Sequence, residues 1–269
     1  MRRTPPAAVE RQKNGRPVID GKSYQRVSTL AKAFDDPYAL NKWKQRMVAL
    51  GVAQSPDLIG LACTATADDR AVLDDVAARA MDRAGAGSGR DIGTAVHAVA
   101  EKIDYQEPVD NLPRDLVDDA QAFRAECERL GLVPALAETF VVAAQYGAAG
   151  SFDRLLTDGK EFYIGDIKTA KVDKDADYAI RYNALKWAIQ LAVYSAGRPW
   201  NEYWQSWESL GVRPPSTVRG IVFHIPRGSG TCAAIDVDLS IGHRAARLAA
   251  EVRDVTTPSL TGTIAQVIA

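Results

Sequence analysis

The sequence has few cysteines, and their spacing argues against several kinds of site. Cys63, Cys127 and Cys232 are scattered along the chain and form no Cys-x-x-Cys pair. A disulfide framework uses an even number of cysteines, and zinc or iron–sulfur sites use closely spaced ones. We therefore expect three reduced thiols, mostly buried, and no iron–sulfur cluster.

Long hydrophobic runs are also missing. No segment approaches the roughly 18 consecutive apolar residues of a membrane-spanning helix. Arg2 and Arg3 are followed by Thr4-Pro5-Pro6 rather than by an apolar stretch, which argues against a secretory signal. The expectation is a cytoplasmic protein, in a host cytoplasm if a phage encodes it, with no membrane partner.

An excess of charge of one sign is absent as well. The chain has 33 Lys and Arg against 34 Asp and Glu, so its formal net charge is −1. No field of the whole molecule points to nucleic acid, and any DNA contact must come from a local patch. The glycine-rich segment 85–89 is not closed by Gly-Lys-Ser/Thr, so no ATP site is predicted.

What is present is an ordinary globular composition, with 46% hydrophobic and 25% charged residues among 269. Apolar residues recur at helical spacing from Ser28 to about Ala84, and Gly51 is expected to stop one helix. The glycine-rich segment is interpreted as a linker before the core. The expected organisation is a flexible arm (1–16), an N-terminal helical lobe (17–91), a core (92–255) and a C-terminal tail (256–269).

Alternating apolar and polar residues predict strands in the second half of the chain. The expected strands cover residues 138–142, 151–157, 160–169, 220–226 and 231–237. The expected helices of the core cover residues 92–104, 114–130, 183–196 and 241–252. This order predicts a mixed α/β (α+β) core in which helices flank a sheet that contains an antiparallel meander.

One hairpin brings charged residues together. Asp158-Gly159 predicts a two-residue turn, which places Asp153 opposite Ile164. Because side chains alternate, Asp153, Asp166 and Lys168 then share a face, with the two aspartates diagonal neighbours at roughly 7 to 8 Å. Two such carboxylates can hold a divalent metal, and Lys168 would help to compensate their charge. One extra loop residue would send Asp153 to the other face.

The Asp-x-Lys pattern is weak by itself, because it occurs three times. Asp20-Gly21-Lys22 and Asp158-Gly159-Lys160 have a central glycine and are typical of turns. Only Asp166-Ile167-Lys168 has an apolar middle residue within a predicted strand. Even there a solvated edge is the commoner explanation, so the interpretation depends on the neighbouring motifs.

Four motifs in a fixed order supply that context. They are Gly93-Thr94-Ala95-Val96-His97, Gly150-Ser151-Phe152-Asp153-Arg154, Gly165-Asp166-Ile167-Lys168-Thr169 and Gln190-Leu191-Ala192-Val193-Tyr194. Over roughly residues 92 to 240 the chain resembles the RecB-like branch of the PD-(D/E)XK nucleases, which includes CRISPR-associated RecB-like exonucleases and bacteriophage exonucleases. The resemblance implies a restriction-endonuclease-like core with a central mixed sheet flanked by helices.

The resemblance also implies roles for individual residues. His97, Asp153, Asp166 and the backbone carbonyl of Ile167 would bind Mg²⁺ or Mn²⁺. Lys168 would position or activate the attacking water and stabilise charge that develops on the phosphate. For His97 the alternative is a histidine that is hydrogen-bonded in a helix interface, since only the resemblance marks it as a ligand.

Four further positions have weaker support. Gln190, Tyr194 and Lys186 are spaced four apart on one helix face, and in the family the glutamine and tyrosine order the site and the DNA. Lys186 is a phosphate contact or a solvated lysine. Glu138 resembles an accessory acid of some relatives, although a surface glutamate on an edge strand is the commoner case.

Three tryptophans recur at helical spacing. Trp200, Trp204 and Trp207 are candidates for stacking on unpaired bases, but such a stripe is more often a core or an oligomer contact. The latter explanation is preferred here.

The expected function is therefore a Mg²⁺- or Mn²⁺-dependent DNA exonuclease in phage or bacterial recombination, repair or degradation. The sequence has no helicase motif, so any unwinding must come from a partner. The expected partners are DNA and a single-strand annealing or helicase protein. Two alternatives remain open. One is a catalytically silent DNA-binding or recombination-partner module with the same fold, and the other is a phage assembly protein that shares the core.

Overall fold

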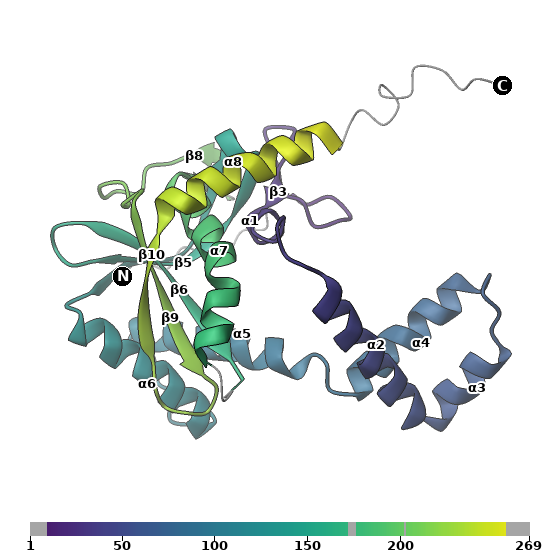
Figure 1. Cartoon of the computed structure of the whole chain (residues 1–269). Coiled ribbons are helices and arrows are strands. Elements are labelled where there is room, and N and C mark those ends of the chain that lie inside the picture. The colour runs from purple at the N-terminus through teal and green to yellow at the C-terminus, as the bar shows by residue number, and fades with distance from the viewer. Residues whose placement is uncertain (1–9, 172–175, 202, 257–269) are drawn as a thin grey trace, which may run out of the picture. The chain divides into compact units, whose positions relative to one another are not determined.

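The structure is a computed structural model that describes residues 10–171, 176–201 and 203–256 (Figure 1). Two compact units divide the chain. One contains Met1–Phe34 and Val96–Ala269, and the other contains Asp35–Ala95. The outer parts of the expected arm and tail, residues 1–9 and 257–269, lie outside the described residues.

The Asp35–Ala95 unit is helical, with α2 (Tyr38–Ala53), α3 (Pro56–Thr64) and α4 (Arg70–Arg83) as its main elements. Leu58, Val76 and Ala80 form its small buried core. The prediction that Gly51 ends a helix is wrong, because α2 continues to Ala53. A Cβ at Gly51 would overlap the carbonyl oxygen of Ala80, so glycine is needed where α2 and α4 cross.

A single large mixed sheet organises the other unit. Its strand order is β10-β9-β6-β5-β4-β7-β8, and β3 pairs with β5 beside this path. The central strands are β4 (Val133–Ala143), β5 (Ala148–Thr157) and β6 (Phe162–Ala170), which form the predicted antiparallel meander. The outer strands are β7 (Arg198–Asn201), β8 (Ser206–Trp207), β9 (Arg219–Pro226) and β10 (Ala233–Asp238). Strand β9 runs parallel to β6 and antiparallel to β10.

Helices cover both faces of this sheet (Figure 1). On one face α7 (Ala176–Ser195) and α8 (Leu239–Thr256) share a core with Leu155 and Ile164. On the other face α5 (Ser88–Asp104) and α6 (Arg114–Arg129) share a core with Leu156 and Tyr163. The alternation of neighbouring residues between the two cores follows from the period of two in a strand. The predicted fold class, a mixed sheet flanked by helices with an additional helical part, is confirmed.

The segment before the helical unit packs onto the sheet. Its elements are β1 (Val18–Ile19), β2 (Lys22–Ser23), β3 (Gln25–Arg26) and the single turn α1 (Val27–Leu30). Gln25 pairs in parallel with Ala148 of β5, and Val27 and Leu30 are buried in the core beside α7. The expected lobe boundary at residue 17 therefore differs from the structure, because these apolar residues bury against the sheet instead of against α2 and α4.

Two other predictions about local structure are wrong. The glycine-rich linker is shorter than expected, since α5 begins at Ser88. The three tryptophans do not lie on a helix: Trp200 and Trp207 pair across β7 and β8, with ring centroids 4.9 Å apart. The preferred interpretation as core residues is confirmed for these two, since Trp200 is buried and Trp207 packs against its cluster. Trp204 is 71% exposed in the connecting turn, where the Asn201 side chain accepts its backbone N–H. The turn that the Asn201 side chain stabilises replaces the helix that the spacing of the tryptophans suggested.

No single helix in the described ranges combines the length and the apolar composition that crossing a membrane requires. Helices α2 and α3 meet both criteria only as a pair, and the pair is bent by 107° at its break.

Candidate active site

The hairpin that carries the candidate site has a longer turn than predicted. Thr157 pairs with Phe162, so four residues, 158–161, form the loop. The Asp158 carboxylate stabilises it by accepting the backbone N–H groups of Lys160 and Glu161 at 2.9 and 2.8 Å. Two extra loop residues shift the register by two and preserve its parity. Asp166 still lies on the face turned toward α7, whereas Asp153 lies at the end of the ladder and contacts His97 of α5.

The corrected register changes the relation between the two aspartates. The last β5–β6 pair is Arg154 with Gly165, and continuing it by one residue sets Asp153 opposite Asp166. They are facing neighbours, not diagonal ones. The ladder itself stops there, and Asp153 Oδ2 accepts the backbone N–H of Ile167 at 3.1 Å. An aspartate side chain thus replaces a backbone partner where the two strands separate.

Glu138 lies beside this break on the neighbouring strand. Ala137 pairs with Arg154 and Thr139 with Phe152, while Glu138 between them has a φ of +45°. This left-handed backbone is uncommon for a residue other than glycine. Partial withdrawal from water and the nearby Asp153 raise the pKa of Glu138 to about 7.

A candidate metal-binding group forms around Asp153. Ligand atoms of His97, Glu138 and Asp153 all lie within 4.8 Å of one another. Of the predicted ligands, His97 and Asp153 belong to this group and Asp166 does not. Glu138, predicted only as an accessory acid, does belong to it. The arrangement can supply two carboxylates and an imidazole to a divalent cation.

His97 reaches the site from α5. Its Nδ1 lies 3.2 Å from Asp153 Oδ2, and its Nε2 lies 2.8 Å from the carbonyl oxygen of Ile167. Three of the four predicted ligands, including the backbone carbonyl, are therefore in direct contact. The contact with the Ile167 carbonyl is expected both for a metal-binding histidine and for a histidine that is hydrogen-bonded in a helix interface.

Asp166 and Lys168 form a close pair on the face of β6 that is turned toward α7. Lys168 Nζ lies 2.5 Å from Asp166 Oδ2, and the aspartate side chain is 3% exposed. Burial raises the pKa of Asp166 to about 7, against the opposing effect of Lys168. Burial disfavours the lysine charge, but Asp166 and Asp153 outweigh it and raise the pKa of Lys168 above its usual value. The pair keeps a cation beside the carboxylates.

Helix α7 supports the pair as its spacing predicted. Gln190 Nε2 donates to Asp166 Oδ1 at 3.3 Å, and the Tyr194 side chain interacts with Gln190. Burial, with Asp166 and Asp153 adding to it, raises the pKa of Tyr194, so its phenol remains protonated. Tyr194 also packs edge-on against Phe152, with centroids 6.5 Å apart. The three helix positions do lie toward the site, since Lys186 and Gln190 line one cavity beside Lys168.

Sequence reasoning missed a buried ion pair behind the site. Arg154 Nε donates to Asp104 Oδ2 at 2.6 Å, and both side chains are 1% exposed. Arg154 Nη1 donates to the carbonyl oxygen of Asp153 at 2.8 Å and lies 3.9 Å from Glu138 Oε1. The arginine next to Asp153 was visible within its motif, but no local pattern linked it to a carboxylate at the end of α5.

Comparison with known proteins assigns no family to this geometry. No family model matches the chain, and no curated protein matches it. The resemblance to RecB-like nucleases therefore depends on the four motifs and their order, and the function has to be argued from the site.

Proposed function

We propose that this protein is a metal-dependent DNA nuclease that hydrolyses phosphodiester bonds, acting as an exonuclease in DNA recombination, repair or degradation. The observation that carries the proposal is the convergence of two groups at the β5–β6 break. One is the His97, Glu138 and Asp153 cluster, and the other is the Asp166–Lys168 pair. Hydrolysis of a charged diester requires both positive charge and a positioned water.

The donors of the site fit Mg²⁺ or Mn²⁺. Both ions favour carboxylate and carbonyl oxygens, and an imidazole suits Mn²⁺ better than Mg²⁺. Asp166 supports this fit, because its buried Oδ2 contacts Lys168 but accepts no well-directed hydrogen bond from the described residues. His97, Glu138 and Asp153 would hold the ion, with the Ile167 carbonyl and Asp166 beside it. When bound, such an ion neutralises phosphate charge and lowers the pKa of a water.

The side chains then have separate tasks. Lys168 presents its ammonium group to a phosphate oxygen and stabilises the charge that develops as water attacks phosphorus and the P–O bond breaks. Asp166 holds that lysine at 2.5 Å, and Gln190 holds Asp166 at 3.3 Å. Arg154 fixes the backbone of Asp153 through its carbonyl oxygen.

A cleavage assay with labelled DNA tests the proposal. Single- and double-stranded DNA labelled at the 5′ or 3′ end is incubated with the protein and Mn²⁺ or Mg²⁺. We expect metal-dependent release of nucleotides, loss of activity in Asp166→Ala, and normal activity in the control Asp236→Ala, whose carboxylate is on the exposed surface of β10. The label that is released first gives the polarity.

Two results would overturn the nuclease proposal. One is an absence of cleavage of every DNA form, and the other is cleavage by Asp166→Ala at the rate of the parent protein. DNA affinity without turnover would favour the silent binding module. No heat of Mn²⁺ binding in calorimetry would favour a purely structural protein.

A further inference from the structure

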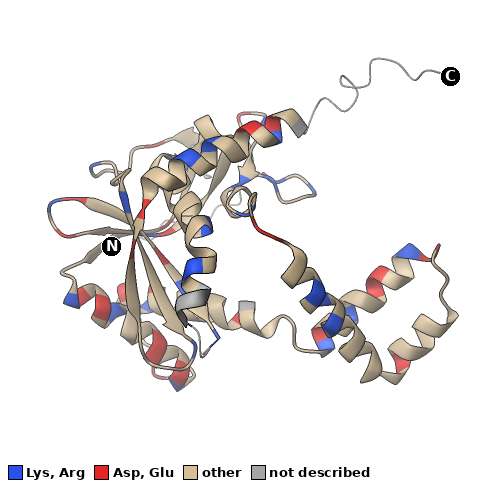
Figure 2. Ribbon diagram, in the orientation of Figure 1, with Lys and Arg blue, Asp and Glu red and all other residues tan. Residues whose placement is uncertain are grey.

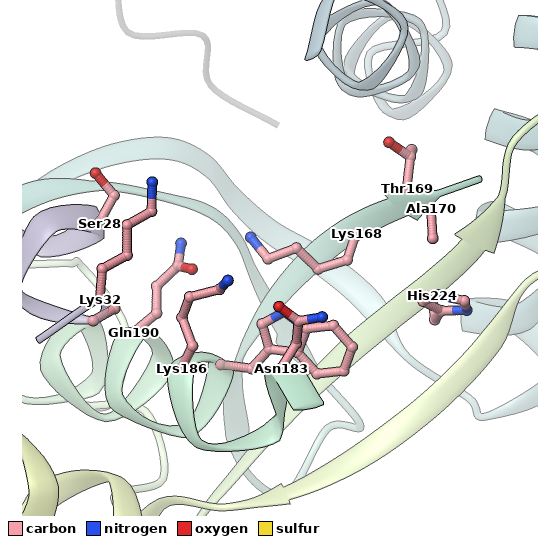
Figure 3. A pocket seen from close by; sticks show the side chains of 11 residues that line it. Ser28, Lys32, Lys168, Thr169, Ala170, Asn183, Lys186, Gln190 and His224 are labelled. Carbon is pink, nitrogen blue, oxygen red and sulfur yellow. The ribbon is translucent and has the colours of Figure 1, made fainter. Parts of the chain in front are cut away.

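A cavity of about 340 Å³ lies next to the candidate site and is not needed to explain it. Its polar lining includes Ser28, Lys32, Lys168, Asn183, Lys186 and Gln190, with Thr169 and His224 beside them. Figure 3 shows Lys32, Lys168, Lys186 and Gln190 directing their side-chain ends toward a common space. These residues belong to three segments that are distant in the sequence.

The segments hold the cavity in place through buried neighbours. Lys32 follows α1, whose Leu30 is 1% exposed, and Ala31 between them is 2% exposed. Gln190 follows Lys186 by one helical turn on α7, so both face the same side. Lys168 comes from the β6 strand. The backbone on each side of the cavity is therefore anchored in the core.

The chemistry of the lining favours an anion. Among the residues that the structure describes, the lining contains three lysines and no carboxylate. From Ile180 to Ser195, α7 carries Arg181 and Lys186 and no acidic residue, while its first turn contains Asp177. Figure 2 shows how Lys and Arg are distributed over the chain. Ser28, Asn183 and Gln190 add neutral donors. Ammonium groups and neutral donors around a small space are the usual surroundings of a bound phosphate.

The cavity is continuous with the candidate catalytic group. Lys168 and Gln190 line it, and both also contact Asp166, at 2.5 and 3.3 Å. A group bound in the cavity would therefore lie beside two side chains that contact the Asp166 carboxylate. A nucleic-acid strand carries phosphates at regular intervals, so a strand at the catalytic group brings further phosphates close to it.

We propose that this cavity binds a second phosphate of the nucleic-acid strand, with Lys32 and Lys186 as the phosphate contacts. The inference deepens the proposed nuclease function and depends on it for the identity of the strand. The phosphate is either at the end of the strand or an internal one. Either source positions the strand while Lys168 acts on the phosphate that is cleaved.

Binding of labelled oligonucleotides without metal tests the cavity separately from cleavage. Fluorescence anisotropy in EDTA compares the parent protein with Lys32→Ala, Lys32→Arg and Lys160→Ala. The control Lys160 is an exposed lysine at the opposite end of β6 from Lys168. Circular dichroism confirms that each variant is folded, and Lys32 is itself exposed.

We expect Lys32→Ala to weaken binding about tenfold at low salt, as for loss of a charge-assisted contact. The slope of log affinity against log salt should become shallower by about 0.7 on a single strand. Lys32→Arg should retain most of the affinity, and Lys160→Ala should match the parent. Equal affinities for Lys32→Ala and Lys160→Ala, or no binding of DNA by the parent, would overturn the proposal.

Oligonucleotides with phosphate or hydroxyl ends distinguish the two sources. If the cavity holds a terminal phosphate, the parent prefers the phosphorylated end and Lys32→Ala loses that preference. If it holds an internal phosphate, the variant loses the same factor on both ends and on a circular strand. A parent that binds with this dependence on Lys32 but never cleaves with Mn²⁺ would retain the cavity inference and refute the nuclease.

Discussion

Arg154 and Asp104 face each other at 2.6 Å with both side chains 1% exposed, at the junction between α5 and β5. Because α5 carries His97 and β5 carries Asp153, the pair joins the two elements that supply the candidate metal ligands. Arg124 adds a longer contact to Asp104, at 3.6 Å from the other carboxylate oxygen. The pair therefore has consequences for stability that are separate from chemistry.

Replacing Arg154 by methionine should be strongly destabilising. The change leaves the Asp104 carboxylate buried without its main partner, so the free energy of unfolding should fall by about 3 to 5 kcal/mol, measured by urea denaturation. Arg124→Met, at a half-exposed position, should cost less than about 1 kcal/mol. The double variant Asp104→Leu with Arg154→Met should recover part of the loss. A single Arg154→Met variant as stable as the parent would contradict this.

The same variant should show a defined pH dependence. Burial already raises the pKa of Asp104 despite Arg154, and removing the arginine raises it further. A carboxyl group whose folded pKa is above its unfolded value holds more protons when folded, so stability falls as pH rises through that range. The loss caused by Arg154→Met should thus grow as pH rises above the raised pKa that Asp104 has in the parent. A loss that is constant with pH would show that Asp104 is not the group responsible.

Glu138 should contribute to metal binding, as its place in the cluster indicates. Glu138→Gln removes one carboxylate from the group within 4.8 Å, and Mn²⁺ affinity measured by calorimetry should fall at least about tenfold. Glu161→Gln, an exposed residue of the β5–β6 loop, is the matched control and should bind as the parent does. Unchanged affinity in Glu138→Gln would leave His97 and Asp153 as the ligands of that group.

Asp119 should be a strong stabilising residue of the β9–β10 hairpin. Its buried carboxylate accepts the backbone N–H of Gly228 at 2.7 Å and that of Gly230 at 2.9 Å. Asp119→Ala leaves both donors without this partner and should lower the free energy of unfolding by about 2 to 4 kcal/mol. Asp119→Asn keeps one acceptor oxygen and should have an intermediate effect, while Asp118→Ala at the half-exposed neighbouring position should have little. Equal stability of the Asp118→Ala and Asp119→Ala variants would show that the hydrogen bonds from Gly228 and Gly230 to Asp119 do not stabilise the hairpin.

Two glycines of the helical unit should respond in opposite ways to alanine. At Gly51 the new Cβ overlaps Ala80, so Gly51→Ala should cost about 1 to 3 kcal/mol by forcing α2 and α4 apart. At Gly60 no atom lies within 4 Å, so Gly60→Ala should stabilise α3 by about 0.5 to 1 kcal/mol. Amide hydrogen exchange over residues 38–83 measures both. The same direction of change in the two variants would contradict the crossing.

The proximity of Asp153 to Asp166 and Lys168 was predictable because an error of two residues in the hairpin register preserves its parity. The turn was misjudged by two residues, since Asp158 caps a four-residue loop instead of forming a two-residue turn. An error of two residues preserves the parity of the register and changes only which residues pair directly across the two strands. Periodicity is a strong signal for the side on which a residue lies, and a weak one for its direct partner.

The remaining parts of the site come from contacts between distant segments. Nothing near Arg154 in the sequence points to Asp104, and the left-handed backbone of Glu138 has no glycine to signal it. The helical pattern around Ser28 predicted a lobe because α1 is helical, but its single turn packs on the sheet. Tertiary packing determines these features, and local secondary-structure propensity does not predict which distant segments pack together.

The unit that contains the sheet is built from two separate stretches of the chain, and this affects the order in which its parts can fold during synthesis. The chain that forms β3 and α1 is made before residues 35–95, and its partner strand β5 is made after them. The helical unit makes its contacts within one continuous stretch of chain and can fold first. Strand β3 can pair only after β5, which is distant in the sequence, has been synthesised. Deletion of the chain up to residue 34 would therefore remove strand β3 of the sheet and the part of the cavity lining that Ser28, Ala31 and Lys32 supply.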